Sequence, residues 1–155
     1  MLTLLSFLGF LLKKNDPNFS ALVKKLDEEL AIRDGDDHAF YHQFNGVTTL
    51  NHVVVAFEKE NAIGCGGFKQ RSKTCVEIKR MYVAPSHRGQ GAASQIMRNL
   101  EHWARALNHL EIQLETGKAQ VEALSFYPNM SYVVMPNFPP YEGVNNSICF
   151  RKRLV

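Results

Sequence analysis

The chain has 155 residues, of which 45% are hydrophobic and 21% charged, and this is ordinary for one compact globular domain. A net charge of +3, carried by scattered basic residues, argues against a nucleic-acid partner. Cys65, Cys75 and Cys149 contain no CxxC pair and are odd in number, so the sequence predicts neither a zinc site nor a disulfide framework. We therefore expect no metal and a reducing, cytoplasmic location.

The apolar opening from Met1 to Leu12 lacks the leading basic region of a signal peptide and is too short to cross a bilayer. We expect residues 1–6 to be a loosely packed leader, Phe7 to Lys13 to be a first strand, and no membrane association. The whole of residues 1–155 is then expected to be one domain.

The next elements are predicted from caps and from apolar spacing. Asp16 and Pro17 are an N-cap and a first helical residue, so a helix should begin there and end near Gly35. His38 to Asn45 is expected to be a short second helix. Three strands should follow, the first two as an antiparallel hairpin, over Leu50 to Glu58, Ile63 to Lys69 and Cys75 to Val83.

Apolar residues at helical spacing predict the clearest helix of the chain between Gly91 and Leu107. Four elements are expected after it: a strand at Leu110 to Leu114, a helix at Val121 to Tyr127, and strands at Tyr132 to Met135 and Ser147 to Lys152. The order is an antiparallel meander followed by β-α-β-α-β-β, with no repeat and no linker that would divide the chain.

The segment between the third strand and the long helix is rich in small residues. There, backbone N-H groups can point at phosphate oxygens, and the positive end of the helix dipole adds to the attraction. Arg88 can support the site by its charge or by shaping the loop. The small residues are Gly89, Gly91, Ala92 and Ala93.

Two common nucleotide motifs do not fit this segment. A Rossmann fingerprint needs a third glycine or alanine where Ser94 stands, and a P-loop needs a Gly-Lys-Ser/Thr sequence that is absent. The run Arg88-Gly89-Gln90-Gly91-Ala92-Ala93 instead resembles the Arg/Gln-x-x-Gly-x-Gly/Ala motif of the GNAT superfamily of acyl-CoA N-acyltransferases. The resemblance extends to Glu77 through Val83, to Leu114 through Gly117 and to Ala123 through Tyr127, and the predicted element order agrees from about Asp16 to Lys152.

The resemblance implies a GNAT-like α/β fold, with a mixed, mostly antiparallel sheet of six to seven strands and about four flanking helices. It also implies acetyl-CoA in a cleft between splayed strands, with the diphosphate on residues Arg88 to Ala93. A bulge in the fourth strand would present backbone groups to the pantetheine arm and the thioester. By position, that role falls to Met81, Tyr82 and Val83.

Transfer to an amine requires removal of a proton, because an amine with a pKa of about 10 is protonated at neutral pH. The resemblance makes Glu77 the candidate base; it is also interpretable as a carboxylate paired with Lys79. His87 and His42 are alternative bases. Strand alternation predicts that Glu77, Lys79 and Met81 share one face, opposite Ile78 and Arg80.

Tyr127 is the candidate acid for the departing CoA thiolate, and is otherwise a core aromatic residue. Next to it the sequence departs from the family, since Pro128 is expected to end the helix early and Ser131 stands where glycine normally makes the turn.

The resemblance places the acceptor near the first helices and last strands, where four aromatic residues and one asparagine stand out: Phe40, Tyr41, Phe44, Asn45 and Tyr141. The predicted function is direct acetyl transfer from acetyl-CoA to a primary amine of a small molecule or peptide, by a monomer or homodimer. The alternatives are a non-catalytic acyl-CoA-binding module and a domain without a ligand.

Overall fold

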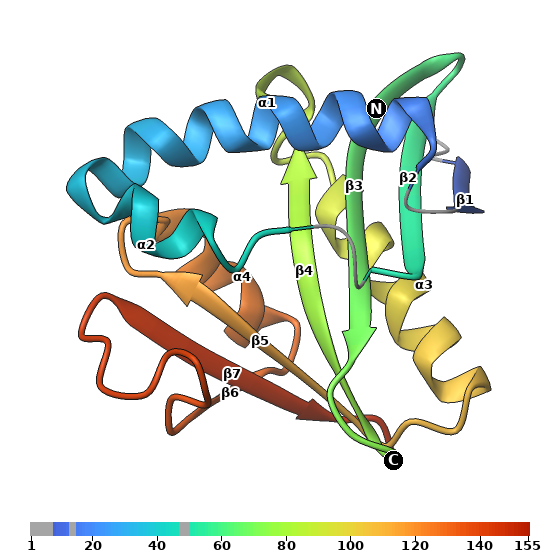
Figure 1. Ribbon diagram of the computed structural model, residues 1–155. Helices are drawn as coiled ribbons and strands as arrows, with labels where there is room; N and C mark the ends of the chain where they lie inside the picture. The colour runs from blue at the N-terminus through green and yellow to red at the C-terminus, as the bar shows by residue number, and fades with distance from the viewer. Residues whose placement is uncertain (1–7, 13–14, 47–49) are drawn as a thin grey trace.

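The computed structural model describes residues 8–12, 15–46 and 50–155, and within them it has a single mixed sheet flanked by helices (Figure 1). The strands are β1 (Leu8–Leu12), β2 (His52–Glu58), β3 (Asn61–Gln70), β4 (Cys75–Val83), β5 (Glu111–Gly117), β6 (Val133–Met135) and β7 (Ser147–Arg153). The helices are α1 (Pro17–Asp34), α2 (His38–His42), α3 (Ala92–Ala106) and α4 (Val121–Asn129), with 3-10 turns at Gly35–Asp37 and Pro85–His87.

The sheet runs in the order β1-β2-β3-β4-β5-β7-β6, and among its neighbouring pairs only β4 and β5 are parallel. The expected fold class is therefore confirmed, as is the hairpin of β2 and β3. The expected leader and the ends of the first predicted strand, Phe7 and Lys13, lie outside the described residues.

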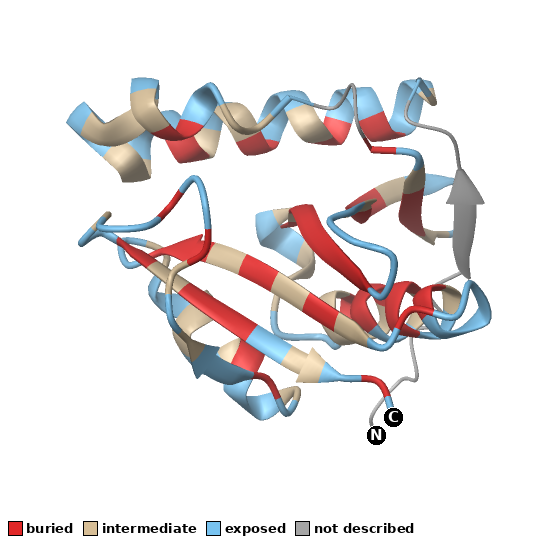
Figure 2. Ribbon diagram, turned by 60° about the horizontal axis from the view of Figure 1, so that its bottom comes forward, coloured by how far each residue is buried: buried red, intermediate tan, exposed pale blue. Residues whose placement is uncertain are grey.

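Helices cover both faces of the sheet. α1 begins as predicted, because the Asp16 carboxylate accepts hydrogen bonds from the backbone N-H groups of Asn18 and Phe19. Its buried side faces the sheet (Figure 2) and packs against β2 and β3. α3 and α4 pack on the opposite face, in the largest apolar cluster.

The centre of that cluster offers a test of the packing. Leu100 of α3 is fully buried, so Leu100→Ala should lower the free energy of unfolding by about 3 kcal/mol through lost contacts and the cavity left behind. Denaturant unfolding measures this loss. Leu107, which is 43% exposed just beyond the same helix, is the matched control, and equal losses in the two alanine variants would contradict this packing.

Two expectations about helix ends were wrong. α2 ends at His42 rather than near Asn45. α4 continues through Pro128 to Asn129, because proline removes only its own N-H bond and the next N-H groups resume the pattern, Met130 N donating to Phe126 O at 3.1 Å. The helix then ends in a left-handed turn at Ser131, with a φ of 71°, where the Ser131 and Tyr132 N-H groups cap the last carbonyls.

Candidate active site

A cleft of about 530 Å³ lies where β4 and β5 separate. The two strands pair in register from Cys75 opposite Glu111 to Glu77 opposite Gln113, and beyond these positions they diverge (Figure 1). Residues of both strands line the cleft, together with residues from α1, α3 and α4. The opening thus has strand edges as its walls and the start of a helix at one end.

A bulge in β4 shapes one wall of the cleft. Cys65 lies opposite Tyr82 and Gly67 opposite Lys79, so Gly66 alone faces the two residues Arg80 and Met81. Arg80 takes a φ of 61° at this bulge. The ladder is interrupted next to the cleft, as the resemblance implied.

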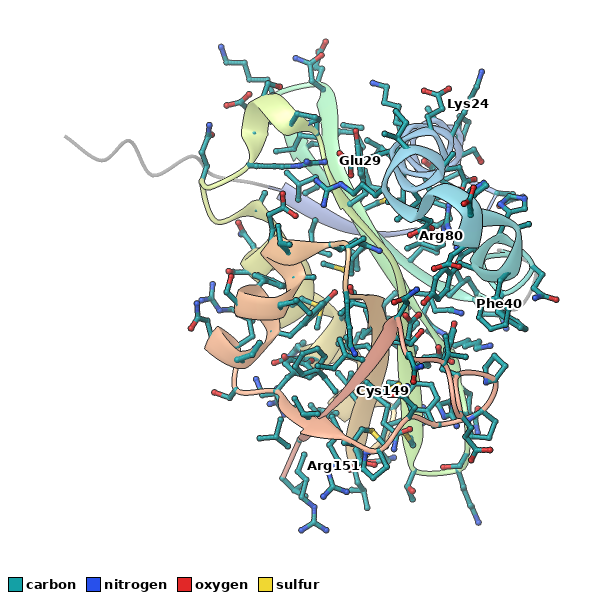
Figure 3. The ribbon with its side chains drawn as sticks, turned by 90° about the vertical axis from the view of Figure 1, so that its left-hand side faces the viewer. Lys24, Glu29, Phe40, Arg80, Cys149 and Arg151 are labelled. Atoms are coloured by element: carbon teal, nitrogen blue, oxygen red, sulfur yellow. The ribbon has the colours of Figure 1, made fainter. Side chains whose placement is uncertain are left out.

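The bulge corrects the predicted alternation of side chains. Arg80 reaches the α1 face, where its guanidinium contacts the Asp27 carboxylate and the Val23 carbonyl (Figure 3). Met81 instead packs with the cluster on the α3 face. The prediction that Met81 shares a face with Glu77, and that Arg80 lies opposite, was therefore wrong, because alternation holds only in a regular strand.

The turn before α3 has the features expected of an anion site. Gly89 and Gly91 have φ angles of 74° and 89°, and the positions where their Cβ atoms would lie are open. No side chain caps the start of α3, so its first N-H groups are not used by a capping residue. An anion in this turn would meet both the N-H groups and the helix dipole.

Arg88 shapes this turn rather than presenting a free charge. Its guanidinium donates to the Val83 carbonyl and to the Glu29 carboxylate of α1, both at 2.8 Å. Of the nine residues predicted to bind the cofactor, eight line the cleft, and Gln90 does not. The eight are Met81, Tyr82, Val83, Arg88, Gly89, Gly91, Ala92 and Ala93.

Tyr127 lines the cleft from α4 and is 7% exposed. Its ring packs near those of Tyr132 and Phe150, with centroids 5.7 and 5.8 Å away. Burial raises the pKa of the Tyr127 hydroxyl far above its usual range, and the nearby Glu115 charge adds to this shift. The hydroxyl therefore holds its proton at neutral pH, and the same shift makes a tyrosinate there take a proton back at once.

Glu77 is buried and is not one of the residues that line the cleft. Its carboxylate lies 3.5 to 3.7 Å from the cationic nitrogens of Lys69, Arg71 and Lys79. Lys79 does line the cleft, and its Nζ donates to the Phe44 carbonyl at 2.9 Å and to the Tyr141 hydroxyl at 3.3 Å. Glu77 therefore acts on the cleft through its ion pair with Lys79 and through its charge, which raises the pKa of Glu115.

Glu115 of β5 is a cleft carboxylate that is not among the predicted catalytic residues. Burial raises the pKa of its carboxyl to about 7, opposed by a hydrogen bond with Ser147 and by the Lys79 charge, and its Oε1 atom is buried without a hydrogen-bond partner. A signal was present, because Ile112 and Leu114 are apolar and buried, so alternation places Glu115 on the opposite face of β5.

The predicted acceptor residues separate into two groups. Tyr41, Asn45 and Tyr141 line the cleft, and the Tyr41 hydroxyl hydrogen bonds to Ser147 at 2.9 Å. Phe40 and Phe44 do not line it; they pack edge to face on each other and on the two tyrosines. They support the aromatic wall from behind.

The alternative bases differ in their setting. His87 lines the cleft, but its ring nitrogens contact Glu58 at 2.7 Å and Ser86 at 2.9 Å. His42 is exposed and outside the cleft. Glu115 is therefore the cleft carboxylate that combines a pKa near neutrality with a free oxygen.

The three cysteines are buried free thiols. Burial raises the pKa of Cys65 to about 12 and that of Cys75 to about 11, so neither is a thiolate at neutral pH.

None of the helices within residues 15–46 and 50–155 has the length and hydropathy of a membrane-crossing segment.

A splayed pair of parallel strands, a bulged strand and an uncapped helix start are the arrangement expected of an acyl-CoA-dependent transferase. The model of the acetyltransferase (GNAT) family matches residues 18–132, and the chain belongs to this family. It is an acyl-CoA-dependent N-acetyltransferase.

Relatives of known sequence give the same class. The uncharacterised N-acetyltransferase YsnE of Bacillus subtilis is 30% identical over 64% of this chain and 67% of its own length. An IAA acetyltransferase of Azospirillum brasilense is 29% identical over 57% of this chain and 58% of its own length.

Solved structures share the fold. A Klebsiella pneumoniae protein assigned as an acyl-CoA N-acyltransferase superposes with a TM-score of 0.81, at 26% identity over 97% of this chain and 99% of that one. YncA from Salmonella typhimurium, solved with acetyl-CoA, superposes with a TM-score of 0.68 at 16% identity, over 97% and 95% of the two chains. Neighbours of this fold bind CoA or acetyl-CoA, which supports a CoA-type cosubstrate.

Proposed function

We propose that this chain moves an acetyl group directly from acetyl-CoA to a primary amine. The observation that carries the proposal is the shared cleft, in which the uncapped start of α3, the β4 bulge, Tyr127 and Glu115 all line one cavity. The open glycines and uncapped N-H groups suit a diphosphate, and the wall at Met81 to Val83 suits an extended arm with a thioester.

In this proposal Glu115 takes a proton from the bound ammonium group, which frees the nitrogen lone pair for attack on the thioester carbonyl. A carboxyl with a pKa of about 7 is suited to this task near neutral pH. The N-C bond forms as the C-S bond breaks. Tyr127 then protonates the departing thiolate and regains a proton from the new amide nitrogen.

Glu77 retains a role as a positioning residue in this proposal. Its carboxylate neutralises Lys79, which in turn donates to Tyr141 at the acceptor end of the cleft. Residues 1–155 would act together as one acetyltransferase domain.

The experiment that tests the function is release of free CoA thiol from acetyl-CoA across a panel of amines that includes peptides. The proposal expects release that depends on an amine and is matched by acetylated product. If CoA raises the melting temperature but no amine causes release, the chain is a non-catalytic acyl-CoA-binding module. If neither CoA nor acetyl-CoA alters melting, the cleft has no such ligand.

The role of Tyr127 is tested by Tyr127→Phe. We expect kcat to fall about tenfold at pH 7, with the deficit shrinking above pH ~8.5, where a thiolate leaves without protonation. CoA binding should be unchanged, because the ring is kept.

The control is Tyr132→Phe, which removes a neighbouring buried hydroxyl that bonds Glu101 at 3.0 Å. That variant should lose stability but keep its kcat. Full kcat in Tyr127→Phe would remove this tyrosine from the chemistry.

A further inference from the structure

Two carboxylates line the cleft near Tyr41, Asp34 from the last turn of α1 and Glu115 from β5. The Asp34 side chain is 4% exposed, and one of its oxygens lies 3.8 Å from where a Cβ on Gly117, two residues beyond Glu115, would stand. Each carboxylate is close enough to affect Tyr41, and the charge of Asp34 also acts on Glu115. They therefore form one electrostatic site.

The cationic side chains that line the cleft are already paired. Arg33 pairs with Glu122 and Glu29, Arg88 with Glu29, Arg80 with Asp27 and Lys79 with Glu77. Among the described residues, by contrast, no lysine or arginine lies within 4.0 Å of Asp34 or Glu115. His38 is the nearest partner of Asp34, at 3.9 Å, and is beyond hydrogen-bond range.

The position of Asp34 is unfavourable for folding. A carboxylate in the last turn faces the negative end of the helix dipole, and burial without a lysine or arginine partner adds a desolvation penalty. Burial accordingly raises the pKa of Asp34, and the contact with His38 opposes the shift only in part. A cation held between Asp34 and Glu115 would relieve both penalties.

We infer that the acceptor carries two ammonium groups, one that Glu115 deprotonates for acetylation and a second that Asp34 holds as an ion pair. This inference rests on the proposed function and narrows it to diamines and related polycations. The reacting nitrogen loses one proton to Glu115 and, after the N-C bond forms and the C-S bond breaks, a second to the CoA thiolate through Tyr127. The second ammonium keeps its charge throughout.

An acceptor with a carboxylate, such as an amino acid, would need a free cation in the same place. Lys79 is the cleft cation whose charge acts on Glu115, and each of the two groups alters the pKa of the other. Its Nζ, however, is occupied by the Phe44 carbonyl, the Tyr141 hydroxyl and the Glu77 carboxylate. The charged groups at this end of the cleft that have no lysine or arginine partner are the carboxylates of Asp34 and Glu115.

The test compares diaminobutane with butylamine, which has the same chain length and one nitrogen, and with alanine as a carboxylate-bearing amine. In the wild-type protein, kcat/KM for diaminobutane should exceed that for the other two by at least about tenfold. In Asp34→Asn, the ratio of kcat/KM for diaminobutane to kcat/KM for butylamine should fall about tenfold. Asp36→Asn, an exposed neighbour outside the cleft, should change neither.

Stability separates the role of Asp34 from misfolding, because Asp34→Asn removes an unfavourable charge and should melt no lower than the wild-type protein. Equal kcat/KM for diaminobutane and butylamine, an equal fall for both in Asp34→Asn, or a preference for alanine would each overturn the inference while leaving the acetyltransferase function in place. Absence of turnover with every amine would overturn both.

Discussion

Glu115→Gln should lower kcat/KM for amine acetylation by about a hundredfold or more at pH 7, because the amide cannot accept the proton of the bound ammonium group. The acid limb of the pH profile should also move. In the wild-type protein kcat/KM should rise through about pH 7, the pKa of Glu115. In the variant it should keep rising toward the amine pKa of about 10, since only the neutral amine reacts.

Glu115→Gln should also change how the free energy of unfolding depends on pH. The folded pKa of about 7 lies above the ordinary value of 4.5, so between these pH values the folded state holds a proton that the unfolded state has released. The free energy of unfolding should therefore fall by roughly 3 kcal/mol as the pH rises through this window, and Glu115→Gln should remove this fall. Denaturant unfolding at pH 5 and pH 8 measures it.

Two controls make the experiment specific. Glu111→Gln changes a carboxylate on the same strand that bonds Gln113 and lies outside the cleft, and it should leave both profiles in place. Glu77→Gln should lower stability, because it leaves Lys69, Arg71 and Lys79 without their shared carboxylate. If the acid limb vanished in Glu77→Gln and persisted in Glu115→Gln, the base would be Glu77.

Gly91→Glu should abolish the stabilisation of the protein by CoA. The carboxylate would project into the open space beside the turn, next to where the diphosphate would lie, and like charges at such a site should weaken binding at least about a hundredfold. Calorimetric titration with CoA and the CoA-dependent shift in melting temperature both measure the loss.

Gly91→Ala separates charge from backbone strain. Any side chain at a φ of 89° costs stability, on the order of 1 kcal/mol, so both variants should be less stable than the wild-type protein. The alanine variant should still bind CoA. Unchanged CoA binding in Gly91→Glu would show that the turn before α3 is not the diphosphate site.

Most of the fold was predictable because its signals are local. The cap at Asp16 and Pro17 fixes the start of α1, and a run of strand-forming residues places β4 at Cys75 to Val83 without error. The order of elements then followed from their sequence. The prediction that Pro128 ends α4 early was wrong, because it applied the rule that proline breaks a helix. In the last turn of α4, Pro128 removes one hydrogen bond and leaves the helix intact.

The site was predictable only in part, because its acceptor end depends on contacts distant in sequence. The turn at Arg88 to Ala93 and the position of Tyr127 follow from contiguous motifs, and both line the cleft. The bulge at Arg80 and Met81 reverses which face each side chain takes, and alternation carries no information about it. Asp34 comes near Gly117 and acts on Glu115 only because the fold brings the end of α1 close to the end of β5.

The most direct measurement is of product and thiol together, when the purified chain is incubated with acetyl-CoA and the amine panel and the mixture is examined by mass spectrometry. The proposal predicts that one amine gains an acetyl group in step with free CoA, and that Glu115→Gln slows both equally. Binding of CoA without an acetylated amine from any acceptor, peptides and diamines included, would contradict it.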